Sequence, residues 1–291
     1  MSSEPRHYPV LLKETLEYLA VKPEGTYVDV TAGLGGHTGA IAERLTSGLV
    51  ISCDRDEESL EIAKRNTERY AERIRFHHGE FSTLEAALSA NGLEKVDGVV
   101  ADLGVSRYQL ASGERGFSLM EDGPLDMRMR RSDPESAADL VNFLPEKALA
   151  DLIYQLGEER RSRRIARAIV RARPIHTTGR LAQVIESAVP RTGKIHPATQ
   201  TFMALRLSVN RELEELKDLL RIVPERLRQE GRFVVLTFMS TEDRIVKQAF
   251  QSLARERRAT ILTKHVVRPT EEELSENPPS RSAKLRALAM N

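Results

Sequence analysis

Short apolar runs alternate with amphipathic segments over the first hundred residues of the chain. Four apolar runs have the length and bounding residues of strands: Thr26–Thr31, Leu49–Asp54, Ile74–Gly79 and Val96–Leu103. Three segments between them show helical spacing: Thr38–Thr46, Glu57–Tyr70 and Leu84–Ala90. Strands that alternate with helices form a parallel sheet with right-handed crossovers. The pattern therefore predicts an α/β fold of the doubly wound, Rossmann-like class.

The alternation stops after Asp102. Residues 104–133 carry Gly, Ser, Asp and Pro without a sustained period, and such a long loop is usually functional or marks a boundary. Four helical patterns follow: Pro145–Leu156, Glu158–Arg173, Thr178–Ala188 and Pro197–Leu220. Strand patterns then return, with one helix among them: Arg232–Phe238, Glu242–Glu256, Thr260–Val267 and Lys284–Met290. The sequence predicts an all-helical insertion at 110–210, an α/β domain formed by 1–109 and 211–291, and a surface loop at 271–282.

The composition indicates a globular protein without a membrane partner. Of the 291 residues, 40% are hydrophobic, and no stretch approaches the roughly 20 apolar residues that span a bilayer. The segment Met1–Val10 lacks the apolar core of a signal peptide, and Cys53 is the only cysteine, which fits a reducing compartment. We therefore expect a cytoplasmic protein. One cysteine and seven scattered histidines give no pattern for a structural metal site.

The distribution of charge is more informative than its total. The net charge is +1, but seven arginines fall between Arg160 and Arg173. Four of them recur at the spacing of one helix face: Arg160, Arg164, Arg167 and Arg171. Ile165 and Ile169 form the opposite, apolar face, so the pattern predicts a helix with a buried side and a cationic side. Contact with phosphates is the functional interpretation, and a solvated face paired with neighbouring glutamates is the alternative.

A glycine-rich turn follows the first predicted strand, which ends at Asp29. The residues between this strand and the first helix include Gly33, Gly35, Gly36 and His37. Glycine lets a backbone approach a ligand closely and adopt positive φ, and ligands bind at the carboxyl edge of a doubly wound sheet. Asp54 ends the second strand, nineteen residues after Gly35, where an acid can accept hydrogen bonds from the ribose hydroxyls of an adenosine cofactor.

Asp29 helps to separate two cofactor classes that share this geometry. A dinucleotide places its pyrophosphate over the glycine turn, where an adjacent carboxylate would repel it. S-adenosylmethionine has no phosphate and carries a sulfonium and an ammonium group, which an acid at the strand end suits. Thr38 also breaks the Gly-x-Gly-x-x-Gly spacing of dinucleotide sites. These features favour S-adenosylmethionine, while a nicotinamide-dependent oxidoreductase, a purely structural turn and a non-catalytic RNA-binding protein stay open.

At this point the residues resemble a known family, the ribosomal RNA small-subunit methyltransferase H family, also called MraW. The matching motifs run along nearly the whole chain: His7–Leu11, Asp29–His37, Asp102–Ser106, Glu114–Ser118, Asp122–Met129, Gly157–Arg160, Arg164–Ile169, His196–Thr199 and Glu242–Arg244. The block Gly116–Met129 is very specific to this family. The resemblance implies methylation of the N4 amine of a cytidine in the decoding region of 16S ribosomal RNA, with the small ribosomal subunit as partner.

The resemblance also implies a set of functional residues. The implied cofactor contacts are Gly35, Gly36, His37, Asp54, Phe81, Asp102 and Gln109. Phe81 follows the third strand, where a ring can flank the adenine, and Asp102 and Ser106 are the candidates for holding the target amine. The helical insertion is expected to recognise RNA, and Gly116–Met129 is interpreted as a loop that closes over cofactor and base, with an ordered structural linker between the domains as the alternative. The sequence is compatible with a homodimer.

Three positions depart from the pattern of the family. Arg107 and Tyr108 follow Ser106 where the family usually has Ser-Pro, Ala111 replaces an acid that commonly follows Gln109-Leu, and Met239 replaces the histidine of a Phe-His-Ser segment. These departures concern the pocket for the target base. They leave the cofactor motifs intact.

Overall fold

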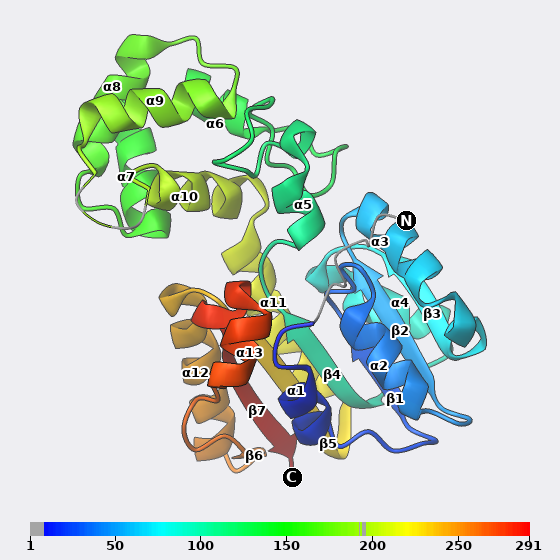
Figure 1. Ribbon diagram of the computed structural model, residues 1–291. Helices are drawn as coiled ribbons and strands as arrows, with labels where there is room; N and C mark the ends of the chain where they lie inside the picture. Colours follow the sequence, from blue (N-terminus) through cyan, green and yellow to red (C-terminus); the bar gives the residue numbers. More distant parts are fainter. Residues whose placement is uncertain (1–8, 192, 194–195) are drawn as a thin grey trace. The chain divides into compact units, whose positions relative to one another are not determined.

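A computed structural model describes residues 9–191, 193 and 196–291. The chain divides into two compact units (Figure 1). The first unit comprises the residues up to Gly104 together with Glu214–Asn291, and the second comprises Val105–Leu213. The sequence placed these boundaries at 109/110 and 210/211, so the structure assigns a few more residues at each end to the helical unit. Among the described residues, no helix combines the length and apolar character needed to cross a bilayer.

The first unit contains a seven-stranded sheet with the order β3-β2-β1-β4-β5-β7-β6. Its strands are β1 Thr26–Asp29, β2 Leu49–Asp54, β3 Ile74–His78, β4 Val96–Asp102, β5 Leu227–Thr237, β6 Ala259–Ile261 and β7 Lys284–Met290. The strands β1 to β5 are parallel, while β7 pairs antiparallel with both β5 and β6. The chain winds outward from β1 to β3 and returns to place β4 beside β1. Ligands of doubly wound sheets bind at such a reversal, which here lies at the carboxyl edge of β1 and β4.

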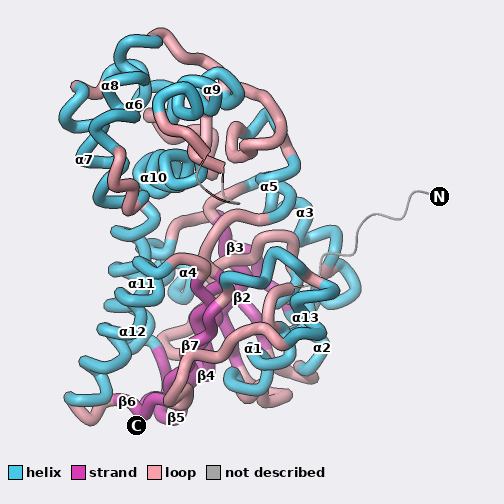
Figure 2. Tube along the Cα trace, turned by 60° about the vertical axis from the view of Figure 1, so that its left-hand side comes forward, coloured by secondary structure: helices cyan, strands magenta, loops and turns pink. Residues whose placement is uncertain are grey.

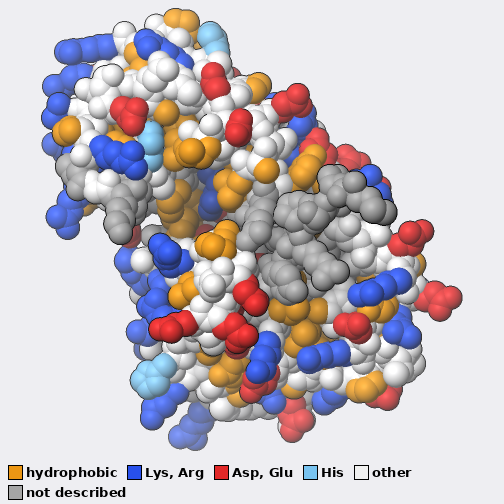
Figure 3. All heavy atoms as spheres, viewed as in Figure 1, with side chains coloured by type: hydrophobic (Ala, Val, Ile, Leu, Met, Phe, Trp, Pro, Cys, Tyr) orange, Lys and Arg blue, Asp and Glu red, His pale blue; other side chains and the backbone are white. Residues whose placement is uncertain are grey.

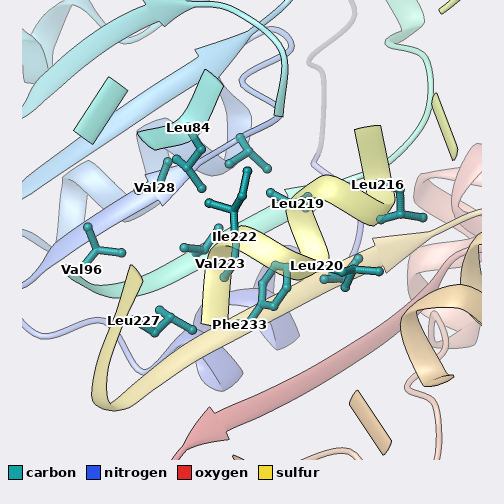
Figure 4. Packing of buried hydrophobic residues seen from close by; sticks show 14 of the residues in the cluster. Val28, Leu84, Val96, Leu216, Leu219, Leu220, Ile222, Val223, Leu227 and Phe233 are labelled. Carbon is teal, nitrogen blue, oxygen red and sulfur yellow. The ribbon is translucent and has the colours of Figure 1, made fainter. Parts of the chain in front are cut away.

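Helices cover both faces of the sheet (Figures 1 and 2). They are α1 Leu12–Leu19, α2 Gly36–Arg44, α3 Glu57–Asn66, α4 Leu84–Ala90, α11 Glu212–Arg226, α12 Ser240–Arg255 and α13 Glu271–Glu276. Successive strand residues point to opposite faces, so Val99 lies in one apolar cluster and Val100 in another. Figure 4 shows the first cluster, in which Ile222 of α11 packs with Val28 of β1. Both strand faces are therefore apolar, as the continuous runs predicted.

The structure corrects two expectations in this unit. The predicted surface loop at 271–282 is α13 followed by the 3-10 helix Pro278–Ser282. Thr270 caps α13 by accepting a hydrogen bond from the backbone N–H of Glu273, a Thr-x-x-Glu signature that the proline content obscured. The predicted strand Thr260–Val267 is shorter, because β6 ends at Ile261 and only Val267 forms a further isolated bridge, with Leu285.

The second unit is built from helices and loops around its own apolar core, with one isolated bridge between Pro124 and Thr177. Its helices are α5 Arg107–Ala111, α6 Ala137–Phe143, α7 Glu146–Gly157, α8 Ser162–Ala172, α9 Thr178–Ala188 and α10 Thr199–Val209. The core includes Ile153 of α7, Ile165 of α8 and Leu205 of α10, all of them fully buried. Each helix thus contributes an apolar stripe, as amphipathic periodicity requires.

Two predicted long helices of this unit are interrupted. The predicted helix Pro197–Leu220 breaks at Asn210, where Arg211 takes a left-handed conformation with φ 49°. The fully buried side chain of Asn210 accepts from Met129 N at 2.8 Å and donates to Met127 O at 2.8 Å. The predicted helix Glu158–Arg173 begins only at Ser162, because Glu158 ends α7 in a left-handed conformation. Tertiary hydrogen bonds and chain reversals override helical periodicity at both places.

The block Gly116–Met129 belongs to the core of the second unit rather than to a free loop. Phe117, Leu125, Met127 and Met129 are all at most 7% exposed. Only its tip is open to solvent, where Met120 is 90% exposed. The interpretation of the whole block as a closing loop is therefore wrong for its buried part, because its apolar side chains fill a packed core.

Candidate active site at the carboxyl edge of the sheet

Asp29 ends β1 and organises the glycine turn from within the protein. Its carboxylate accepts hydrogen bonds from Thr31 N at 3.1 Å and Thr38 Oγ1 at 2.7 Å, and Thr38 in turn bonds Ser52. Asp29 has no exposed surface. Asp29 therefore holds the turn and contributes its negative charge from behind it, while the prediction that this acid suits a cationic donor stays a prediction.

A Cβ atom would meet different surroundings at each glycine of the turn. Gly33 has φ +50°, and a Cβ there would meet only Thr31 O at 3.8 Å. Gly35 has φ +87°, and its Cβ would come within 2.9 Å of Thr67 Cγ2. A Cβ on Gly36 would lie 2.5 Å from Pro9 Cγ. The space beside Gly35 and Gly36 is thus occupied by protein, whereas the Cβ direction of Gly33 is open.

Asp54, at the end of β2, closes the turn from the neighbouring strand. Its carboxylate accepts from Gly33 N at 2.8 Å and from Asp56 N at 2.9 Å. Burial raises the pKa of Asp54 to about 6, although these two backbone N–H groups oppose the shift. Each oxygen keeps a lone pair after accepting one bond. Asp54 therefore has acceptor capacity for a ligand's hydroxyl groups at the turn.

Asp102, at the end of β4, faces His37 on α2. Asp102 Oδ2 lies 3.7 Å from His37 Nδ1, and the backbone N–H of Asp102 donates to Thr31 Oγ1 at 2.7 Å. Its other oxygen, Oδ1, is buried without a hydrogen-bond partner among the described residues. Burial raises the pKa of Asp102 to about 6, and His37 opposes this shift. A buried carboxylate oxygen without a partner is costly unless a ligand group satisfies it.

The structure brings the predicted residues of the first unit to one edge and leaves two others in the second unit. Phe81 directly follows the loop after β3 and is partly buried against the apolar cluster of Figure 4. Ser106 and Gln109 belong to the second unit, where they form a reciprocal capping box at the start of α5. Their contact with the cofactor site stays a prediction. His7 of the N-terminal motif lies outside the described residues.

Sequence reasoning missed two acids that approach Asp102 from other elements. Glu273 of α13 accepts from Leu11 N at 2.8 Å, and Glu242 of α12 accepts from Phe238 N and Met239 N at 3.1 Å. Both acids raise the pKa of Asp102. Glu242 stood in a recognised motif, but its role was not assigned, and Glu273 is separated from Leu11 by 262 residues, so no local pattern connects them.

The cationic face of α8 forms a second candidate site, in the second unit. Arg163, Arg164 and Arg171 are exposed and make no ion pair with another described residue, while Arg167 lies 3.5 Å from Glu146 in an exposed pair. Figure 3 shows Lys and Arg side chains gathered along the edge of the unit where Figure 1 places α8. Arg160 is exposed but lies in the turn before the helix. The predicted helical face therefore comprises Arg164, Arg167 and Arg171, with Arg163 beside them.

The fold and the site together define a class I methyltransferase. The defining features are the strand order, the antiparallel β7, the glycine turn after β1 and the acid that ends β2. The chain belongs to the MraW methylase family, whose model matches residues 4–291. This membership rules out the nicotinamide-dependent oxidoreductase.

Two relatives carry the same name, ribosomal RNA small subunit methyltransferase H. The protein from Solibacter usitatus (strain Ellin6076) is 61% identical over 284 residues, which cover 98% of this chain and 99% of the relative. The protein from Koribacter versatilis (strain Ellin345) is 48% identical, over 97% of this chain and 93% of the relative. A solved structure of a putative rRNA-methylase from Clostridium thermocellum is similar in backbone, with 11% identity, a TM-score of 0.47 and coverage of 98% of this chain and 100% of that one, and this distant likeness adds nothing to the assignment.

Proposed function

We propose that this methylase transfers a methyl group from S-adenosylmethionine to the N4 amine of a cytidine in the decoding region of 16S ribosomal RNA. Family membership and the name of the 61% identical relative support the reaction class and the small-subunit RNA. The choice of cytidine N4 and of the decoding region rests on the motif resemblance. The observation that carries the proposal is the buried Oδ1 of Asp102 at the carboxyl edge of the sheet, which has no hydrogen-bond partner within the described part of the chain.

The residues at this edge fit a cationic adenosyl donor. The free lone pairs of Asp54 suit the two ribose hydroxyls, and the ring of Phe81 suits one face of the adenine. Asp102 supplies negative charge and an open acceptor, and Asp29 adds a second buried negative charge behind the turn. When bound, S-adenosylmethionine supplies an electrophilic methyl group on a positively charged sulfur. The arrangement favours a cation over a phosphate ligand because both acids would repel an anion.

The acceptor side of the reaction needs alignment more than a strong base. The lone pair of the cytosine amine is delocalised into the ring, so the protein must orient the amine, and orientation contributes on the order of 7–11 kcal/mol in favourable cases. The amine gains one methyl group and releases one proton, which the carboxylate of Asp102 accepts. Ser106 lies four residues further along the chain, so the two Cα atoms are at most about 14 Å apart. Its hydroxyl group is our second candidate for holding the amine.

The RNA is expected to contact the cationic face of α8 and to present an unstacked base. A base reaches a cofactor at a sheet edge only when it leaves its stack or comes from a single strand. Arginines on one helix face bind phosphates without reading sequence. The sequence of the target is then selected by the pocket and by the shape of the RNA.

Methyl transfer with mapping of the product tests the reaction. Wild-type protein, labelled S-adenosylmethionine and small subunits that lack the modification are incubated, and the RNA is digested to nucleosides. We expect labelled N4-methylcytidine from the decoding region, and Asp54→Ala should abolish transfer by weakening donor binding while RNA binding is kept. Free 16S RNA is tested in parallel to identify the form that is recognised. Label in another nucleoside, or none in any, would refute the proposal, and the second result would favour a non-catalytic RNA-binding role.

Charge reversal tests the RNA surface separately from catalysis. Arg164→Glu with Arg167→Glu should weaken binding to a decoding-region RNA and lower the slope of log K against log salt by about 1.4, since each single-strand phosphate contact contributes about 0.7. Lys247→Glu with Arg255→Glu, on exposed positions of α12, changes the net charge equally and serves as control. Equal weakening by both pairs would show that only total charge matters.

A further inference from the structure

Helix α13, near the end of the chain, is joined to the first described residues beside the site. The backbone N–H of Leu11 donates to Glu273 Oε1 at 2.8 Å. Leu11 is fully buried and holds a left-handed conformation with φ 49°, just before α1. The preceding residue, Val10, places its carbonyl oxygen 3.2 Å from Nε2 of His37. A carboxylate on α13 is therefore two hydrogen bonds away from a ring that faces Asp102.

We propose that Glu273 is a positioning residue that, through the backbone of Val10 and Leu11, fixes the orientation and the tautomer of His37 so that its nitrogen without a hydrogen, Nδ1, faces Asp102. The contacts among Glu273, Leu11, Val10, His37 and Asp102 all lie within the first unit. Their importance for catalysis rests on the proposed function, in which Asp102 accepts the proton of the target amine. Helix α13, the residues Val10 and Leu11, and helix α2, which are far apart in the sequence, thus together set the surroundings of the Asp102 carboxylate.

The tautomer follows from the chemistry of the partner. A backbone carbonyl can only accept a hydrogen bond, so Nε2 of His37 must carry a hydrogen to bond Val10 O at 3.2 Å. The neutral ring then has its lone pair on Nδ1, which lies 3.7 Å from Asp102 Oδ2. His37 is only 4% exposed, so its ring lies almost entirely within the protein. The nitrogen that can take up a proton is consequently the one beside the carboxylate.

The groups around Asp102 show why this orientation matters. Its charged neighbours lie on four elements and are His37 on α2, Asp29 on β1, Glu242 on α12 and Glu273 on α13. Burial raises the pKa of Asp102, the three acids raise it further, and His37 alone lowers it. Among the charged neighbours, His37 has the largest effect and Glu273 the smallest. A ring turned this way places Nδ1 beside Asp102, and when this nitrogen also carries a hydrogen the positive charge of the ring favours the ionised carboxylate.

Two substitutions of Glu273 separate its hydrogen bond from its charge. Glu273→Gln keeps an acceptor for Leu11 N and removes one acid near Asp102. Glu273→Ala removes both, and it frees the segment that orients His37. Because His37 affects Asp102 more than Glu273 does, the acidic limb of the pH profile of kcat/KM should shift to higher pH in Glu273→Ala. In Glu273→Gln it should stay or shift slightly to lower pH. Glu272→Gln, an exposed residue of the same helix, is the control with the same charge change.

The direct test is the state of the His37 ring, measured by ¹⁵N NMR of the full chain without donor or RNA. His37→Gln assigns the signal among the seven histidines. Wild type, Glu273→Gln and Glu272→Gln should show the neutral ring protonated only at Nε2, and Glu273→Ala should show both tautomers. An unchanged ring in Glu273→Ala would overturn the proposal. If this variant does not fold, Glu273→Asp replaces it, since its shorter side chain must withdraw from Leu11 N, and an unchanged ring there would be equally decisive. Absence of methyl transfer by the wild type would refute the proposed function and leave this result standing.

Discussion

Replacing Gly35 by alanine tests whether the glycine turn is dictated by packing inside the protein. Gly35 has φ +87°, and a Cβ atom there would lie 2.9 Å from Thr67 Cγ2 and 3.2 Å from Ala63 Cα. Gly92 is a matched control, because its φ is +68° and its Cβ would meet nothing within 4 Å among the described atoms. Both substitutions put a side chain in the left-handed region, and only one adds a collision.

The two costs can be worked out separately. Left-handed backbone costs an L-residue about 1–2 kcal/mol, and the smaller entropy of the unfolded chain returns about 0.4–1 kcal/mol. Overpacking against α3 adds about 1–3 kcal/mol. The free energy of unfolding should therefore fall by about 0.5–1.5 kcal/mol in Gly92→Ala and by about 2–4 kcal/mol in Gly35→Ala.

Urea unfolding followed by circular dichroism measures both variants against the wild type. The comparison also separates packing from ligand contact, because it is made without any donor. Equal destabilisation by the two substitutions would refute the reasoning. It would mean that the corner formed by Thr67 and Ala63 gives way, and that the glycine at position 35 is needed for another reason.

Three further results are expected. Burial raises the pKa of Asp54 to about 6, so as pH falls the folded chain takes up a proton before the unfolded chain does, and this group adds to the free energy of unfolding between pH 7 and pH 5. Asp54→Asn should lack this gain when urea denaturation is measured at both pH values. A pH dependence identical to that of the wild type would refute the raised pKa. Asn210→Ala should destabilise the protein by about 2–5 kcal/mol, because it leaves buried backbone groups such as Met129 N without a hydrogen-bond partner. Hydrogen exchange at the Met129 amide should become faster, and an exchange rate equal to that of the wild type would contradict the prediction. Gly33→Ala, whose Cβ meets open space, should weaken donor binding at least tenfold by calorimetry with little more loss of stability than Gly92→Ala, and unchanged affinity would show that the donor does not approach Gly33.

The α/β layout was readable from the sequence because its strands are continuous apolar runs and its turns carry glycine and acids. The runs at Leu49–Asp54 and Lys284–Met290 coincide with β2 and β7. The acids Asp54 and Asp102 could be named as candidate site residues because each ends a predicted strand, and parallel strands place their ends at one edge. Periodicity failed where a single residue redirects the chain, as Glu158 and Arg211 do with left-handed backbone.

By itself, the sequence determined the family, the parallel sheet and the two acids at its carboxyl edge, because these depend on local patterns and on motifs of adjacent residues. Only the tertiary structure decided that the buried Asp29 holds the glycine turn, that protein atoms fill the space beside Gly35 and Gly36, and that Glu273 accepts a hydrogen bond from Leu11 N. Such contacts join segments that are far apart along the chain. The order of residues along the chain specifies which side chains are apolar or charged. Which of them are buried, and which groups they pair with, depends on the residues that the fold brings next to them.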